Sequence, residues 1–143
     1  MLQALTGIQN TVAALDAERT RLDVISENIA NANTTHGVDG KPYQRKVVVF
    51  ENALQDAMGG GDNIASPAPL QVARIEKDNR PPISVYEPGN PDADARGMVQ
   101  MPNINIHEEM ADLISASRVF EANLAVVKNE KSMAMQTLAI GKH

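Results

Sequence analysis

The sequence predicts an α+β fold in which long N- and C-terminal helices pair as a coiled-coil-like hairpin, with a small antiparallel β domain inserted between them. Three observations lead to this fold class. Apolar residues recur at helical spacing at both ends, short β-branched runs separated by turn formers fill the middle, and aromatic residues make up only 3% of the 143 residues. We expect a helical segment at 1–36, a β-rich insert with turns at 37–101 and a second helical segment at 102–143.

The N-terminal helix is expected from about residue 3 to 32. Its apolar positions alternate steps of four and three residues, which is the heptad spacing of a helix seam. Polar residues at two of these steps would make the seam weak as an isolated two-stranded coil, because each polar group must be solvated or paired. The seam consists of Met1, Leu5, Ile8, Val12, Leu15, Arg19, Leu22, Ser26 and Ile29.

The C-terminal helix has its own seam and a recognisable start. Asn105 followed by Glu108 resembles a capping box, and acidic residues crowd the first turns, where the helix dipole favours them. The seam is formed by Met110, Leu113, Ser117, Phe120, Leu124, Val127, Lys131, Ala134 and Leu138.

A second stripe on this helix consists of small residues, which would let another helix approach closely. A helix with two packing faces and only one obvious partner in its own chain suggests partners outside the chain, although small residues can also reflect helix propensity. The stripe is formed by Ala111, Ser115, Ala122 and Ala125.

The middle of the chain is expected to form one small antiparallel sheet of about three strands, at 43–50, 69–76 and 82–87. Turn formers at 59–63, 66–69, 79–82 and 87–94 separate these runs. Lys41, Arg45 and Lys46 are the densest basic stretch, and we interpret them as a solvated strand face in preference to a phosphate site.

Charge and composition exclude several classes of protein. A net charge of −5 argues against sequence-independent binding of nucleic acid or anionic lipid. The absence of cysteine excludes disulfides and thiolate metal sites. The longest strongly apolar run, at 47–50, is far shorter than the ~20 residues of a membrane span. The first basic residue, Arg19, follows the N-terminal apolar stretch, unlike in a cleavable signal, so composition alone indicates the cytoplasm.

No catalytic, metal or cofactor site is expected. The run HEEMA at 107–111 resembles the zinc motif H-E-x-x-H, but Ala111 replaces the second histidine, and His36 and His143 are the remaining histidines. The run GGGDN at 59–63 lacks the lysine and hydroxyl residue of a phosphate-binding loop. The serines at 115 and 117 have no activating histidine at helical spacing.

Two segments resemble a known family, the axial rod and hook proteins of the bacterial flagellum. LDVISENIANANT (22–34) is similar to the N-terminal signature of that family, S-x-N-[IL]-A-N-x-N-T. The segment 85–142 is similar to the C-terminal half of one family member, including Y-E-P-G-x-P, M-P-N-[VI] and A-S-R-x-[YF]-x-A-N. Two positions depart from the family pattern: Met98 replaces an aromatic residue, and Phe120 stands where Tyr is common.

The resemblance implies a structural subunit of the proximal rod, with no catalysis and no cofactor. Such a subunit is exported unfolded by the flagellar type III system without a cleaved signal. It then polymerises helically with other rod proteins, next to the basal-body ring and export base, into a hollow drive shaft that crosses the cell envelope. No nucleic acid and no small-molecule substrate is implied. The alternative from another class is a secretion chaperone or coiled-coil adaptor that holds a client helix in its seam.

The asparagines of the first motif invite a specific hypothesis. Asn28 and Asn31 are one turn apart, and we expect them to hydrogen-bond across a subunit boundary and fix axial register, while Asn33 satisfies terminal carbonyls or turn amides. Simple helix termination remains the alternative for all three. The resemblance also implies interface roles for Pro102, Asn103, Arg118, Phe120 and Asn123.

Overall fold

The structure is a computed structural model and describes residues 2–37, 39–52 and 70–140. Two long helices flank four short strands in these parts of the chain. In order they are α1 (Leu2–Ala30), β1 (Lys46–Asn52), β2 (Leu70–Lys77), β3 (Ile83–Tyr86), β4 (Met98–Met101) and α3 (Ile106–Ile140). The turns predicted at 59–63 and 66–69 lie outside the described residues.

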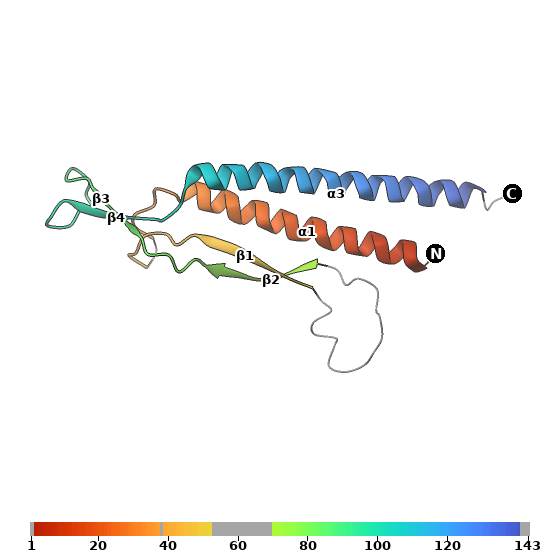
Figure 1. Cartoon of the computed structure of the whole chain (residues 1–143), viewed down its shortest axis with the longest axis horizontal. Helices are drawn as coiled ribbons and strands as arrows, with labels where there is room; N and C mark the ends of the chain where they lie inside the picture. Colours follow the sequence, from red (N-terminus) through yellow and green to blue (C-terminus); the bar gives the residue numbers. More distant parts are fainter. Residues whose placement is uncertain (1, 38, 53–69, 141–143) are drawn as a thin grey trace, which may run out of the picture.

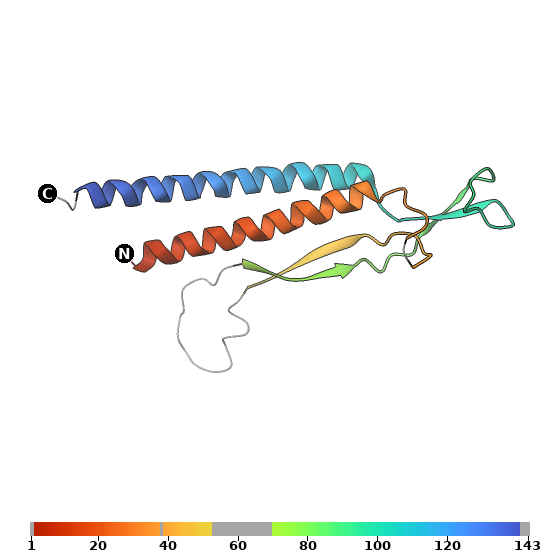
Figure 2. The same ribbon diagram turned by 180° about the vertical axis from the view of Figure 1, so that it is seen from behind.

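The two helices lie side by side and run in opposite directions, so that the first turn of α1 and the last turn of α3 are at the same end of the molecule (Figures 1 and 2). Their bounds agree within two residues with the predicted helix at 3–32 and with the predicted start after Asn105. The Asn105 side chain accepts a hydrogen bond from the backbone N–H of His107 at 3.1 Å, which is the expected N-cap.

Three layers make up the body of the molecule, and α1 is the middle one. It contacts α3 on one side and the β1–β2 pair on the other (Figure 1). Ala17, Val24 and Ile25 are buried between these neighbours, and Ala116 of α3 is also buried. A narrow core of small and β-branched side chains fits the low aromatic content of the chain.

The strands form two separate two-stranded antiparallel sheets, so the predicted single sheet of three strands is wrong. β1 pairs with β2, with Lys46 opposite Lys77 and a register shift between Val49 and Phe50. β3 pairs with β4, with Tyr86 opposite Met98. The prediction missed β4 because its four residues, MVQM, are too few to show a β pattern, and because only one of them is β-branched.

Gly97 closes the β3–β4 hairpin, which extends away from the helices (Figure 1). Its φ of 76° lies in the left-handed region that favours glycine. A Cβ at this position would lie 2.9 Å from the ring of Tyr86 and 3.1 Å from the side chain of Pro88. Both backbone conformation and space therefore require glycine here.

The predicted seam of α1 is not the stripe that the chain buries. Val12, Arg19 and Ser26 of the seam are exposed, whereas Ala17 and Val24 are buried. At about 100° per residue these two sets lie on roughly opposite sides of the helix. The seam spacing correctly predicted the helix, but within this chain its apolar side chains are only partly covered. Val12 is exposed, and the half-buried members are Ile8, Leu15, Leu22 and Ile29.

The predicted seam of α3 is only partly covered. Leu113, Phe120 and Val127 are half-buried, whereas Met110 and Leu124 are exposed. All four members of the small-residue stripe are exposed as well. Both helices therefore keep apolar or small side chains exposed: Val12 on α1, and Met110, Leu124 and the small-residue stripe on α3.

Candidate functional site

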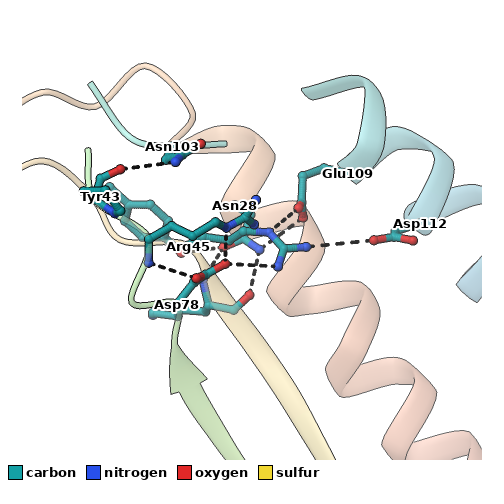
Figure 3. Close-up of polar contacts among 10 residues, drawn as sticks. Asn28, Tyr43, Arg45, Asp78, Asn103, Glu109 and Asp112 are labelled. Carbon is teal, nitrogen blue, oxygen red and sulfur yellow. Dashed lines mark hydrogen bonds and ion pairs between the residues drawn. The ribbon is translucent and has the colours of Figure 1, made fainter. Parts of the chain in front are cut away.

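A buried polar cluster lies where the end of α1, the start of β1 and the first turns of α3 meet (Figure 3). Asn28 and Glu109 are each only 1% exposed, which makes them among the most deeply buried side chains of the described residues. Burying an amide and a carboxylate is costly unless both are hydrogen-bonded. The hydrogen-bond partners of these two side chains therefore decide whether α1, β1 and α3 can pack together.

Asn28 binds the backbone of β1 through both ends of its amide. Its Nδ2 donates to the Lys46 carbonyl at 2.9 Å, and its Oδ1 accepts from the Lys46 N–H at 2.9 Å. This pair of bonds satisfies backbone groups that an edge strand leaves unpaired. The Nδ2 also donates to Glu109 Oε2 at 3.1 Å, and the Tyr43 hydroxyl donates to Oδ1 at 3.1 Å.

Glu109 is neutralised by Arg45. The Arg45 Nε donates to Glu109 Oε1 at 2.6 Å, while the other carboxylate oxygen accepts from Asn28. Both oxygens of the buried carboxylate are thus bonded, which is the condition under which a buried ion pair is tolerated. The predicted solvated role is wrong for Arg45, whose side chain reaches from the residue before β1 to α3.

Further charges surround the cluster. Asp78 lies 3.7 Å from Arg45, and Asp112 lies 3.9 Å from it on the exposed side. The backbone N–H of Arg80 donates to Asp78, and this bond lowers the pKa of the Asp78 carboxyl. Lys46, the third basic residue of this stretch, is also ion-paired, because its Nζ lies 2.5 Å from Glu27 Oε1.

Tyr43 forms the outer wall of the cluster (Figure 3). Burial raises the pKa of its hydroxyl from 10.0 to about 12, and the negative charges of Glu27 and Glu109 act in the same direction. The hydroxyl therefore stays protonated and keeps donating to Asn28.

Within the chain, the three asparagines of the motif make different contacts. Asn28 is only 1% exposed, and both ends of its amide are bonded. Asn31 stabilises the helix end, because its Nδ2 donates to the Glu27 carbonyl at 2.9 Å and its Oδ1 accepts from the Thr34 hydroxyl at 3.2 Å. Asn33 is exposed in the following turn, and its side chain makes no hydrogen bond to the described residues, so Asn31 performs the role expected of Asn33.

The remaining predicted residues are scattered along the C-terminal segment. Pro102 is buried, and Asn103 donates to the Pro81 carbonyl at 3.2 Å. Phe120 and Asn123 are half-buried on α3, whereas Arg118 is exposed and has no ion pair with the described residues. None of the three α3 residues belongs to the polar cluster.

The bonds of this cluster join elements of the fold to one another. The part of the chain that the structure describes contains no group of three or more histidine or acidic side chains that could hold a metal ion. No helix within it is long and apolar enough to cross a membrane. The cluster joins two helices and a strand through directional bonds to buried groups.

Sequence reasoning missed Glu109, Arg45 and Tyr43. Glu109 looked like one of several acidic residues at a helix N-terminus, and nothing in its spacing distinguishes it from Glu108. Arg45 carried a weak signal, since a lone arginine next to a β-branched run can pair with a distant carboxylate. Arg45 and Glu109 are 64 positions apart in the sequence, so their pairing cannot be predicted without knowledge of the fold.

Comparisons with known proteins match both ends of the chain. Residues 8–37 match the family described as "Flagella basal body rod protein". Residues 95–140 match the family described as "Flagellar basal body rod FlgEFG protein C-terminal". These matches, together with the two long helices, define the class as rod proteins of the flagellar basal body.

Similar proteins from several bacteria identify the member of this class. A flagellar basal-body rod protein FlgC of Escherichia coli O6:H1 is 44% identical over 131 residues, covering 91% of this chain and 92% of the relative. Its counterpart in Borreliella burgdorferi is 42% identical over 146 residues, covering 94% and 95%. That of Bacillus subtilis is 38% identical over 152 residues, covering 99% and 100%. The chain belongs to the FlgC family and is a structural rod subunit of the bacterial flagellum, which sets the chaperone alternative aside.

Proposed function

We propose that this subunit polymerises helically with other rod proteins of the proximal rod, after export in an unfolded state, and that its helix pair lines the resulting hollow shaft. The working location of the subunit is then the basal-body rod, and it carries out no catalysis and binds no cofactor. One observation carries this proposal: the described parts of the chain leave apolar side chains of both long helices exposed or half-buried, and most of the exposed ones lie on α3.

The seam of α1 is partly open: Val12 is 44% exposed, and its other described apolar members are half-buried. On α3, Leu124 of the predicted seam is 38% exposed. A heptad seam is a surface that accepts another helix. Contiguous exposed apolar surface on a protein usually marks an interaction site. The two seams act as coiled-coil-like surfaces of a hairpin, each shared with a helix of a neighbouring subunit.

The interface roles follow from exposure. Asn33 and Arg118 offer polar groups to a neighbour, Phe120 is part of the seam of α3, and Asn123 borders that seam. Asn31, Pro102 and Asn103 act by holding the two helix ends in place. Asn28 fixes the angle between α1 and β1 from inside the chain, so it supports the interface without touching the neighbour. The segments 1–36 and 102–143 form the rod core, and 37–101 forms an outer domain.

The test replaces one exposed apolar residue on each helix by glutamate, in the variant Val12→Glu, Leu124→Glu. Purified protein should keep its helical circular dichroism, because both side chains are already exposed in the isolated chain. Cells carrying the variant should fail to complete rods in electron micrographs of basal bodies and should not swim.

The matched control is Ile75→Glu, Ile83→Glu, which changes two strand residues of similar exposure, 49% and 47%. Control cells should build rods and swim. Normal rods in the helix variant, or equal loss in both variants, would contradict the proposal that the open helix faces are the assembly surfaces.

A further inference from the structure

A basic pocket of about 620 Å³ lies between the end of β2, the segment before β1 and the base of the β3–β4 hairpin. This volume is within the range of about 300–1,000 Å³ that ligand sites occupy. Although the chain has a net charge of −5, the pocket is lined by five basic side chains and only two acidic ones, Asp39 and Asp78. The basic residues are Lys41, Arg45, Lys46, Lys77 and Arg80.

Only some of these charges are available to a ligand. Arg45 is bound to Glu109, Lys46 to Glu27 and Arg80 to Asp78. Lys41 and Lys77 are exposed, and neither has an ion pair with the described residues. Asp39 is also exposed and has no ion pair with the described residues. The pocket therefore offers two free ammonium groups and one free carboxylate, so its available charge is still positive.

The walls of the pocket suit an organic ligand better than a bare anion. Pro42, Tyr43 and Pro82 provide apolar surface, while Gln44 and Gln100 provide amides that can donate or accept. Lys77 ends β2 and Gln100 belongs to β4, and each of these strands has only one neighbour in its sheet. An extended peptide can bond to such strand ends while its side chains reach the ammonium groups.

We propose that this pocket binds an extended acidic segment of a partner protein, through ion pairs with Lys41 and Lys77 and apolar contacts with Pro42, Tyr43 and Pro82. The proposal goes beyond the assembly role of the helices, because the pocket lies on the β-rich part of the molecule and uses none of the open helix faces. Its occupant is a peptide rich in Asp or Glu, since charge complementarity is the main feature of the surface.

The experiment uses the full-length chain labelled with ¹⁵N and titrated, at low ionic strength, with a hexaglutamate peptide blocked at both ends. Amide shifts should saturate and cluster at 41–46, 77–80 and 100–103. Reversing both charges in Lys41→Glu, Lys77→Glu should weaken binding by about tenfold or more, because two attractions become repulsions. The pair Lys41→Arg, Lys77→Arg should retain binding.

A matched control reverses two exposed lysines on α3, in Lys128→Glu, Lys131→Glu, and should bind as the wild type does. Because Lys41 and Lys77 are exposed, the reversed variant should keep its circular dichroism; if it unfolds, Lys41→Gln, Lys77→Gln replaces it. No saturable shift at millimolar peptide, or equal binding by the reversed variant, overturns the proposal. Inorganic phosphate or a single-stranded oligonucleotide that binds as tightly as the peptide also overturns it.

Discussion

Glu109 is a buried carboxylate whose two oxygens are held from different parts of the chain, by Arg45 just before β1 and by Asn28 of α1. Removing one partner from such an arrangement leaves the other charge poorly solvated. The side chain of Arg45 is partly exposed, so water can compensate for some of the loss.

The first prediction concerns Glu109→Gln, which keeps the shape of the side chain and removes its charge. We expect the free energy of unfolding to fall by about 1.5–3 kcal/mol, the range for hydrogen bonds to charged groups. Urea denaturation, monitored by circular dichroism, measures this free energy. The matched control is Asp112→Asn, which changes a partly exposed partner of Arg45. Its free energy of unfolding should fall by less than about 1 kcal/mol. Equal effects of the two substitutions would mean that burial of Glu109 has no energetic consequence.

The second prediction concerns Tyr43, whose pKa is raised in the folded state to about 12. A pKa that is higher in the folded than in the unfolded state means that the native protein holds its proton more tightly. The stabilisation is complete below the unfolded value of 10.0 and is lost as pH rises towards about 12. Ionisation would remove the donor to Asn28 and place a charge close to Glu27 and Glu109.

Absorbance of tyrosinate measures this pKa directly in a Tyr86→Phe background, where Tyr43 is the remaining one of two tyrosines. The midpoint should lie near 12. The loss of stability above pH 10 that belongs to Tyr43 should be absent in Tyr43→Phe. A midpoint at 10.0 would show that the hydroxyl is not shielded in the folded chain.

At the scale of elements, helix existence and helix ends were predictable from the sequence. Both helices have long periodic patterns, and Asn105 provides a start signal that acts locally through its own side chain. The face that each helix buries was not predictable in the same way. The apolar seam of α1 is regular, yet α1 packs inside the chain through Ala17 and Val24, because a pattern does not state whether its partner belongs to the same molecule.

The strands show where local patterns stop being informative. β1 and β2 have β-branched runs and were found close to their predicted positions, whereas β4 consists of four residues and is specified mainly by pairing with β3. The polar cluster is a similar case. Asn28 was singled out by its motif, but its partners Lys46 and Glu109 lie 18 and 81 positions away in the sequence, so their contact depends on the whole fold.

The whole molecule is unevenly packed along its length. Near the polar cluster α3 contributes the buried residues Glu109 and Ala116, whereas every residue from 131 to 140 is exposed. Local opening of a helix costs least where few contacts have to be broken. We therefore expect the far end of α3 to be poorly ordered in the isolated chain and to gain order on assembly.

Hydrogen exchange measured by mass spectrometry tests this third prediction. In the isolated protein, amides of residues 131–140 should exchange well before those of 109–117. The paired strands β1 and β2 serve as an internal reference within the same sample. In purified basal bodies the two parts of α3 should become similarly protected. Uniform protection along α3 in the isolated chain would show that the helix needs no neighbour to be ordered.

The two hydrogen bonds between the Asn28 amide and the backbone of Lys46 have a mechanical consequence. Apolar contacts between a helix and a sheet resist separation but allow some slip along the interface, whereas a pair of hydrogen bonds to the N–H and C=O of one residue fixes position in both directions. A torque applied to α1 is therefore passed to the β1–β2 ribbon at one defined point, next to the buried charge pair, so that helix and ribbon turn together.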